Sequence, residues 1–222
     1  MKKFDAIAFD LDGTLYPNWR FYLRLMPQVI THLPLLTAFR KARSILHRTT
    51  ETGNFYRRQA EICAKYLNID SEAAFQKIES HIYNFWPLQF KSIKLYPRVR
   101  ETMQLFKDNN LKLGVLSDFK LKDKLEYLKL NGIFDAELCS EQIGVLKPNS
   151  VPFNKLAQEL QTDPKRILYV GNSVKFDIFG AKNAGFGGTA LIYRGIFKNR
   201  RSFQVSDLCF SDYRQLQRFV LE

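Results

Sequence analysis

The chain of 222 residues has few cysteines and no long apolar segment. Its three cysteines are widely separated, and none stands at the spacing of a metal-binding cluster. No apolar run is long enough to span a membrane. Asp5 and Asp10 interrupt the apolar stretch near the start, so we expect no secretory signal there. We therefore expect a cytoplasmic protein without structural disulfides.

Acidic residues are absent between Gly13 and Thr50, although six basic residues fall in that segment. The whole chain carries a formal net charge of +12. Such an excess indicates anionic partners, which are phosphorylated small molecules, nucleic acid or an acidic membrane surface. The basic segment contains no recognisable nucleic-acid-binding motif, and a solvated helix face explains its charge more simply. We expect no nucleic-acid partner.

Two patterns divide the chain. Residues 16–95 have helical periodicity, in which Pro27 and Pro34 predict short helices and Ser71 is a predicted N-cap. From about residue 98, apolar runs alternate with helical segments. Strands are predicted near 4–9, 111–116, 136–139, 166–170, 189–192 and 207–210, and helices near 122–130, 151–160 and 177–184. This alternation predicts an α/β fold, a Rossmann-like doubly wound parallel sheet formed by 1–15 and 96–222, with an inserted all-helical domain at 16–95.

Asp10 and Asp12 follow the first predicted strand directly. Ligands of open α/β sheets bind at the carboxyl ends of the strands, which is where both acids fall. Two carboxylates one residue apart can hold a metal ion, or divide the roles of nucleophile and proton carrier between them. An ordinary solvated loop is the alternative when the pair is considered alone.

Polar residues also follow three later apolar runs. Ser117 and Asp118 follow one, Lys147 follows another, and an oxygen-rich loop that contains Asn172 and Asp177 follows the third. A hydroxyl can hold phosphate oxygens, a lysine can neutralise charge, and hard oxygen ligands suit Mg²⁺. Their joint occurrence at successive strand ends indicates phosphate-ester chemistry.

These motifs, in this order, resemble those of the haloacid dehalogenase superfamily of phosphohydrolases. The motifs are Asp10-Leu11-Asp12-Gly13-Thr14, Ser117 after an apolar strand, Leu146-Lys147-Pro148-Asn149, and Gly171 to Asp177. The resemblance covers nearly the whole chain. The helical insertion is similar to the helical cap of the phosphoglycolate phosphatase-like and nucleotidase-like branch.

The resemblance implies a role for each matching position. Asp10 is the expected nucleophile, which forms an aspartyl-phosphate, and Asp12 is the expected proton carrier, which the metal-free dehalogenase branch lacks. The implied sets are the catalytic residues Asp10, Asp12 and Lys147, the phosphate-binding residues Thr14, Ser117 and Asp118, and the Mg²⁺ ligands Asp10, Asp12 (through its carbonyl), Asn172 and Asp177.

Asn172 departs from the family pattern, which has an aspartate at this position. An amide keeps one oxygen ligand but removes a negative charge, so we expect weaker Mg²⁺ binding or a shift of ligation toward Asp177. Three functions stay open: a Mg²⁺-dependent phosphatase for a small phosphorylated metabolite, a phosphomutase, and a catalytically weakened binding protein that uses the basic helical segment. The candidates for contact with a second anionic group of the substrate are Arg20, Arg24, His32, His47, Arg57 and Arg58.

Overall fold

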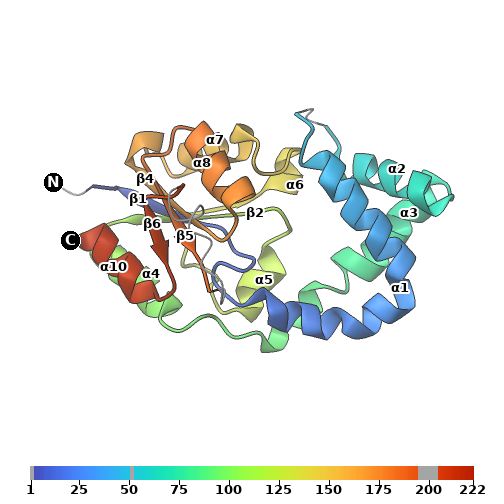
Figure 1. The fold of residues 1–222 in the computed structure, drawn as a ribbon, viewed down its shortest axis with the longest axis horizontal. Helices are drawn as coiled ribbons and strands as arrows, with labels where there is room; N and C mark the ends of the chain where they lie inside the picture. The colour runs from blue at the N-terminus through green and yellow to red at the C-terminus, as the bar shows by residue number, and fades with distance from the viewer. Residues whose placement is uncertain (1–2, 51–52, 195–204) are drawn as a thin grey trace.

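The computed structural model describes residues 3–50, 53–194 and 205–222. Six parallel strands form a sheet in the order β3-β2-β1-β4-β5-β6 (Figure 1). The strands are β1 (Ala6–Phe9), β2 (Lys112–Ser117), β3 (Ala136–Cys139), β4 (Ile167–Gly171), β5 (Gly188–Ile192) and β6 (Leu208–Phe210). The six predicted strands and the α/β class are confirmed, with strand ends displaced by at most two residues.

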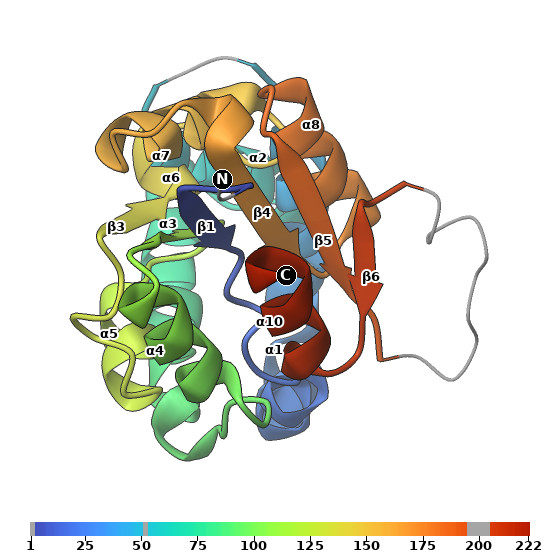
Figure 2. The same ribbon diagram turned by 90° about the vertical axis from the view of Figure 1, so that its left-hand side faces the viewer.

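Helices cover both faces of the sheet (Figure 2). On one side lie α4 (Val99–Asp108), α5 (Lys122–Tyr127) and α10 (Tyr213–Leu221), and on the other lie α7 (Ser150–Glu159) and α8 (Phe179–Asn183). The strand β1 is apolar throughout because helices cover both faces of the sheet. Ile7 and Phe9 pack in one hydrophobic cluster, and Ala6 and Ala8 pack in the other, so neither face meets solvent.

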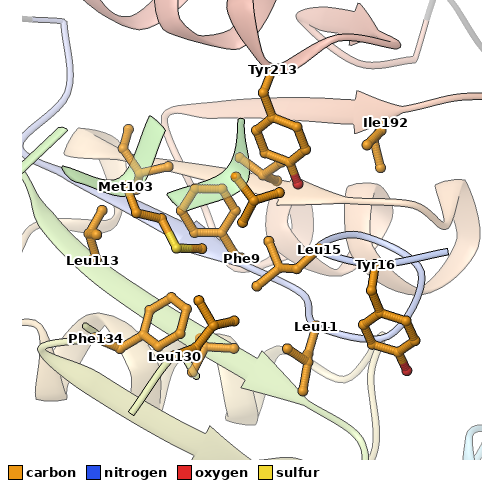
Figure 3. Packing of buried hydrophobic residues seen from close by; sticks show 14 of the residues in the cluster. Phe9, Leu11, Leu15, Tyr16, Met103, Leu113, Leu130, Phe134, Ile192 and Tyr213 are labelled. Atoms are coloured by element: carbon orange, nitrogen blue, oxygen red, sulfur yellow. The ribbon is translucent and has the colours of Figure 1, made fainter. Parts of the chain in front are cut away.

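The larger of these clusters also holds the loop that follows β1. Phe9, Leu11 and Leu15 pack in it with side chains from α4 and α10 (Figure 3). In addition, the Tyr213 hydroxyl donates a hydrogen bond to the Thr14 carbonyl oxygen at 2.7 Å. Buried apolar contacts and the hydrogen bond from Tyr213 therefore hold the backbone around Asp10 in place.

Residues between β1 and α4 form helices and no described strand. They comprise α1 (Asn18–Leu46), α2 (Phe55–Leu67), α3 (Ser71–Ile78), the π-helical turn η1 (Glu79–Tyr83) and the 3₁₀-helix η2 (Pro87–Ser92). This helical block lies beyond the carboxyl ends of the strands, on the far side of the sheet from both termini (Figure 1). No helix of the described residues is long and apolar enough to span a membrane. The division into two domains at 15/16 and 95/96 stays a prediction.

One local prediction in this block holds in part, and another was wrong. Two helical segments make up α1, and they join at a kink where His32 has non-helical backbone angles, two residues before Pro34. A proline lacks the N–H of the helical hydrogen bond and restricts the residue before it, which accounts for a break beside Pro34. Pro27 lies inside the first segment without a break. The N-cap of α3 is Asp70, whose side chain accepts the Ala73 N–H at 2.9 Å, rather than Ser71.

Two other helices differ from the prediction in extent. α5 ends at Tyr127 instead of near 130, and the residues predicted as a helix at 177–184 begin inside a π-helical turn, η4 (Val174–Ile178), that leads into α8. Asp177 lies within this π-helical turn and is 1% exposed. Its burial matters for the arrangement at the sheet edge.

Candidate active site

Asp10 leaves the end of β1 and is almost completely buried. Its Oδ2 accepts a hydrogen bond from the Thr14 hydroxyl at 2.7 Å, which closes a short loop within the first motif. Gly13 lies in that loop with φ of +89°, a left-handed conformation that glycine adopts without steric cost. The loop therefore presents the Asp10 carboxylate in one fixed orientation.

Lys147 joins Asp10 to the acidic loop after β4. Its Nζ lies 2.7 Å from Asp10 Oδ1 and 2.7 Å from Asp177 Oδ1. The second oxygen of Asp177 accepts the backbone N–H groups of Asn172 and Ser173, at 3.1 and 2.9 Å. A lysine that is 3% exposed is tolerated here because two carboxylates compensate its charge.

Asp12 has a separate cation. Both of its carboxylate oxygens lie within 2.8 Å of Lys124 Nζ on α5. The Ser117 hydroxyl donates to Asp12 Oδ2 at 3.1 Å, and the Tyr16 hydroxyl donates to Asp12 Oδ1. The sequence reasoning missed Lys124 and Tyr16. Lys124 could have been found from its position, because it lies on the helix that follows β2 and such helices begin at the ligand-binding edge of the sheet.

The two aspartates occupy different electrostatic environments. Burial raises the pKa of Asp10 to about 7, and the nearby Asp177 and Asp12 act in the same direction against Lys147. Burial also acts to raise the pKa of Asp12, but the Lys124 ammonium and the hydroxyl donors outweigh it and leave that pKa below its ordinary value. The pKa of Lys147 lies well above its ordinary value, since Asp10 and Asp177 overcome the effect of its burial.

The Asp12 carbonyl oxygen and the Asn172 side chain face each other. Asn172 Nδ2 lies 3.0 Å from that oxygen, and Asn18 Nδ2 lies 3.4 Å from it. Two adjacent ligands of octahedral Mg²⁺, each about 2.1 Å from the ion, are about 3 Å apart. Half a turn of the Asn172 amide about its Cβ–Cγ bond places oxygen at this spacing.

The described residues contain no group of three or more His, Cys, Asp or Glu side chains that could bind a metal ion. A cation would therefore depend on the Asp12 carbonyl and the Asn172 amide oxygen as well as on the carboxylates. With the amide turned, the predicted oxygen set of Asp10, Asp12, Asn172 and Asp177 fits Mg²⁺ in ligand chemistry.

Seven of the eight predicted site residues lie together at the edge of the sheet, and Asp118 lies farther from them. Asp10, Asp12, Thr14, Ser117, Lys147, Asn172 and Asp177 are linked by the hydrogen bonds given above. Asp118 lies one step away, because its Oδ1 accepts the backbone N–H of Lys147 at 3.2 Å and its carbonyl accepts from Arg43 Nη2 at 3.2 Å. Its carboxylate thus supports the Lys147 backbone, and its role in phosphate binding stays a prediction.

Of the six basic residues considered for substrate contact, His47 lies beside the site. Its Nδ1 is 2.6 Å from the Lys147 carbonyl oxygen, and its ring stacks on Phe176 at a centroid distance of 4.3 Å. His32 instead packs against His81. Arg20 and Arg24 line a separate surface hollow beside Trp19, and Arg57 lines another hollow between α2 and α3.

A cavity of about 700 Å³ adjoins these residues. Asp12, Tyr16 and Lys124 line it, together with side chains of α1, η2 and the loop after β2. The site therefore has a charged end at the sheet edge and a large hollow against the helical block.

A family model of haloacid dehalogenase-like hydrolases matches residues 4–185. The chain belongs to this family of hydrolases, which confirms the predicted superfamily. It is 27% identical over 206 residues to a glyceraldehyde 3-phosphate phosphatase of Methanopyrus kandleri, across 87% of this chain and 86% of that protein. It is 25% identical over 232 residues to a phosphoglycolate phosphatase of Mannheimia succiniciproducens, across 98% of this chain and 99% of that protein. The phosphatase names of these relatives agree with the predicted enzyme class.

The fold itself is shared with enzymes of another chemistry. A 2-haloacid dehalogenase structure from Pseudomonas syringae aligns with a TM-score of 0.66 and 20% identity, over 97% of each chain. The similarity at this identity concerns the fold alone. The reaction therefore has to be inferred from the site residues.

Proposed function

We propose that this protein is a Mg²⁺-dependent phosphatase that hydrolyses a small phosphorylated metabolite through an aspartyl-phosphate intermediate. The observation that carries the proposal is the array of Asp10, Asp12 and Lys147 at the carboxyl edge of the sheet, with each carboxylate on its own lysine. The family and the phosphatase relatives support it. Asp12 favours phosphoryl chemistry, because the dehalogenase branch of the family lacks that second acid.

In the proposed first step, an Asp10 oxygen attacks phosphorus and the bond from phosphorus to the ester oxygen breaks. Asp12 delivers a proton to the departing alkoxide, which leaves as the free alcohol. In the second step, Asp12 takes a proton from water, and that water attacks phosphorus while the Asp10–phosphorus bond breaks. Inorganic phosphate leaves, and both aspartates return to their initial forms.

The pKa directions at the site show what substrate binding has to change. Asp10 must be ionised to attack, yet burial and two carboxylates raise its pKa. Asp12 must carry a proton in the first step, yet Lys124 lowers its pKa. A phosphate dianion that draws Lys124 away from Asp12 favours protonation of Asp12. Lys124 is therefore placed to couple phosphate binding to the proton-donating form of Asp12.

The residues that would hold Mg²⁺ are Asp10, Asp12 through its carbonyl, Asn172 and, indirectly, Asp177. Bound Mg²⁺ supplies positive charge against the phosphoryl oxygens and the Asp10 carboxylate. In this chain Lys147 provides part of that compensation already. The amide at Asn172 removes one negative charge from the ligand set, so a higher Mg²⁺ concentration is needed than for an aspartate.

A phosphate-release assay with chromogenic and metabolite phosphate esters, with and without Mg²⁺, tests the proposal. Asp10→Asn should abolish turnover, whereas Asp5→Asn, at the other end of the first strand and paired with Arg166 at 2.8 Å, should keep it. Equal activity of wild type and Asp10→Asn would overturn the assigned nucleophile. Recovery of an isomeric sugar phosphate in place of free phosphate would identify a mutase instead.

Asn172→Asp tests the metal assignment. The added charge should lower the Mg²⁺ concentration for half-maximal turnover, with about tenfold or more expected for a direct ligand. Calorimetric titration of Mg²⁺ into the same variant gives an independent measure of affinity. An unchanged Mg²⁺ requirement would show that Asn172 is not a ligand.

A further inference from the structure

The cavity beside Asp12 is built for more than a phosphate and a short carbon chain. Its volume of about 700 Å³ lies in the range of pockets that enclose cofactor-sized ligands, roughly 300–1,000 Å³. Nine of its 23 lining residues are aromatic, whereas aromatic residues make up 14% of the chain. These rings give the cavity an apolar side that an apolar group of a ligand can contact.

An aromatic wall, made of Phe21, Phe39, Trp86, Phe90 and Phe119, forms the cavity's apolar side. Trp86 is its centre, with ring centroids 5.6 Å from those of Phe21, Phe39 and Phe119. Its indole N–H donates to Gln28 Oε1 at 2.8 Å, which fixes the ring's orientation. A flat aromatic ring of a ligand suits this wall, because aromatic rings pack favourably in offset and edge-to-face arrangements.

The aromatic wall continues to the reacting groups. Phe90 contacts the Tyr16 ring edge-on at 5.3 Å, and the Tyr16 hydroxyl donates to Asp12. Lys124, which pairs with Asp12, has its Nζ 5.2 Å from the Phe90 ring and 5.1 Å from the Phe119 ring. A ligand whose phosphate lies at the aspartates would therefore place its remaining part along this wall.

The charge of the cavity agrees with an anionic ligand. Among its lining residues, five are basic (Arg40, Arg43, Lys120, Lys124 and Lys175) and Asp12 is the one acid. Arg43 pairs with Glu141, Lys124 with Asp12, and Lys120 with Glu79 at 3.9 Å. Within the described residues, Arg40 and Lys175 are therefore the lining cations that no ion pair compensates. Phe21, Phe39 and Phe90 are buried, so the accessible ring surface of the wall comes mainly from the half-buried Trp86 and Phe119. A small hydroxylated ester has no apolar group to pack against that surface and gains little from it.

We infer that the substrate is a phosphate monoester whose alcohol carries a flat aromatic ring system, with the ring against the aromatic wall and the phosphate at Asp10. The inference rests on the proposed phosphatase function and narrows its substrate class. It differs from the three-carbon and two-carbon phosphates that appear in the names of the relatives.

Kinetics with matched esters test this class. The kcat/KM for 2-(2-naphthyl)ethyl phosphate, whose leaving group is a primary alkoxide like that of octyl phosphate, should exceed those for glyceraldehyde 3-phosphate, phosphoglycolate and octyl phosphate at least tenfold, about 1.4 kcal/mol. Phosphate release with equal or higher kcat/KM for either small ester would overturn the inference and leave the phosphatase function standing. Preference for octyl phosphate would overturn the aromatic character of the substrate.

A binding measurement separates the inference from catalysis. Calorimetry with Asp10→Asn should show saturable binding of 2-(2-naphthyl)ethyl phosphate, weakened at least fivefold by adding Trp86→Leu. Trp19→Phe, at an exposed tryptophan outside the cavity, is the matched control and should leave that affinity unchanged. If no ester is hydrolysed but this binding pattern holds, the phosphatase proposal fails and the aromatic site stands. If Trp86→Leu and Trp19→Phe bind alike, the inference fails.

Discussion

At the Asp12 carboxylate, one ammonium and two hydroxyl groups converge on two oxygen atoms. Asp10 is held differently, by Lys147 and Thr14, in a more deeply buried position. A pair of acids that is separated by a single residue in the sequence thus contacts two different lysines. The burial of Asp10 and the lysine that reaches each carboxylate account for the opposite directions of the two pKa shifts.

Lys124→Gln tests the ion pair at Asp12. The variant loses the cation that orients this carboxylate and attracts the phosphate, so kcat/KM should fall about tenfold or more. The pKa of Asp12 should rise toward its ordinary range, which moves the alkaline limb of the kcat/KM profile to higher pH. Lys155→Gln, on the exposed face of α7, is the control. A profile identical to wild type would remove Lys124 from the mechanism.

His47 provides a pH-dependent contribution to stability. Burial lowers the pKa of its ring, although Asp118 and the Lys147 carbonyl act in the opposite direction. The unfolded chain, with an imidazole pKa of about 6.5, therefore takes up a proton before the folded chain does. The stability of wild type relative to His47→Gln should be greatest above that pH and should decrease as the pH falls below it. Urea unfolding of both proteins at several pH values would measure this difference; a constant difference would contradict the assignment.

At the scale of elements, a buried polar network attaches the helical block to the elements around the sheet. Arg43 of α1 pairs with Glu141 of α6 (Ser140–Ile143). The Glu141 side chain is buried, with 1% of its surface exposed. The Tyr83 hydroxyl donates to the same Glu141 oxygen at 3.0 Å and accepts from Gln59 Nε2 at 2.9 Å. The network connects α1, α2 and η1 to the core, and it holds the aromatic wall over the site.

Breaking this buried pair should cost more than replacing it. Arg43→Met leaves Glu141 buried without its cation and should lower the free energy of unfolding by about 3–5 kcal/mol. Arg43→Met combined with Glu141→Leu should recover most of that loss, because no uncompensated charge remains. Chemical denaturation of the single and double variants gives the comparison. Equal destabilisation by both would show that the pair itself, rather than the lone charge, dominates.

At the scale of the whole molecule, the net charge of +12 surrounds a site for an anionic substrate. Long-range attraction should raise the local concentration of substrate, and salt should screen it. Raising the ionic strength from ~0.05 to ~0.5 M should therefore increase KM several-fold with little change in kcat, since the Debye length falls well below ~10 Å. Initial-rate measurements at constant Mg²⁺ would check this; an unaffected KM would show that only local contacts matter.

The sheet and most of the residues at its carboxyl edge were readable from the sequence because both depend on local patterns. Apolar runs of four to six residues marked the six strands, and parallel strands bring their carboxyl ends to one edge. Asp10, Ser117, Lys147 and Asp177 each follow such a run or its loop, so their convergence followed from topology. Helix interruptions were less predictable, as α1 shows, because a kink lies beside Pro34 whereas the helix continues through Pro27.

The sequence by itself determined the fold, the family motifs and the residues at the sheet edge, since each is encoded by neighbouring residues. Only the tertiary structure assigned Lys124 and Tyr16 to Asp12, placed Asp118 behind Lys147, and joined Phe21, Phe39, Trp86, Phe90 and Phe119 into one wall. These contacts join side chains up to 112 positions apart, whose meeting depends on how the helical block packs on the sheet. Long-range packing has no local sequence signature, and for that reason the proposed substrate class rests on contacts that only the folded chain shows.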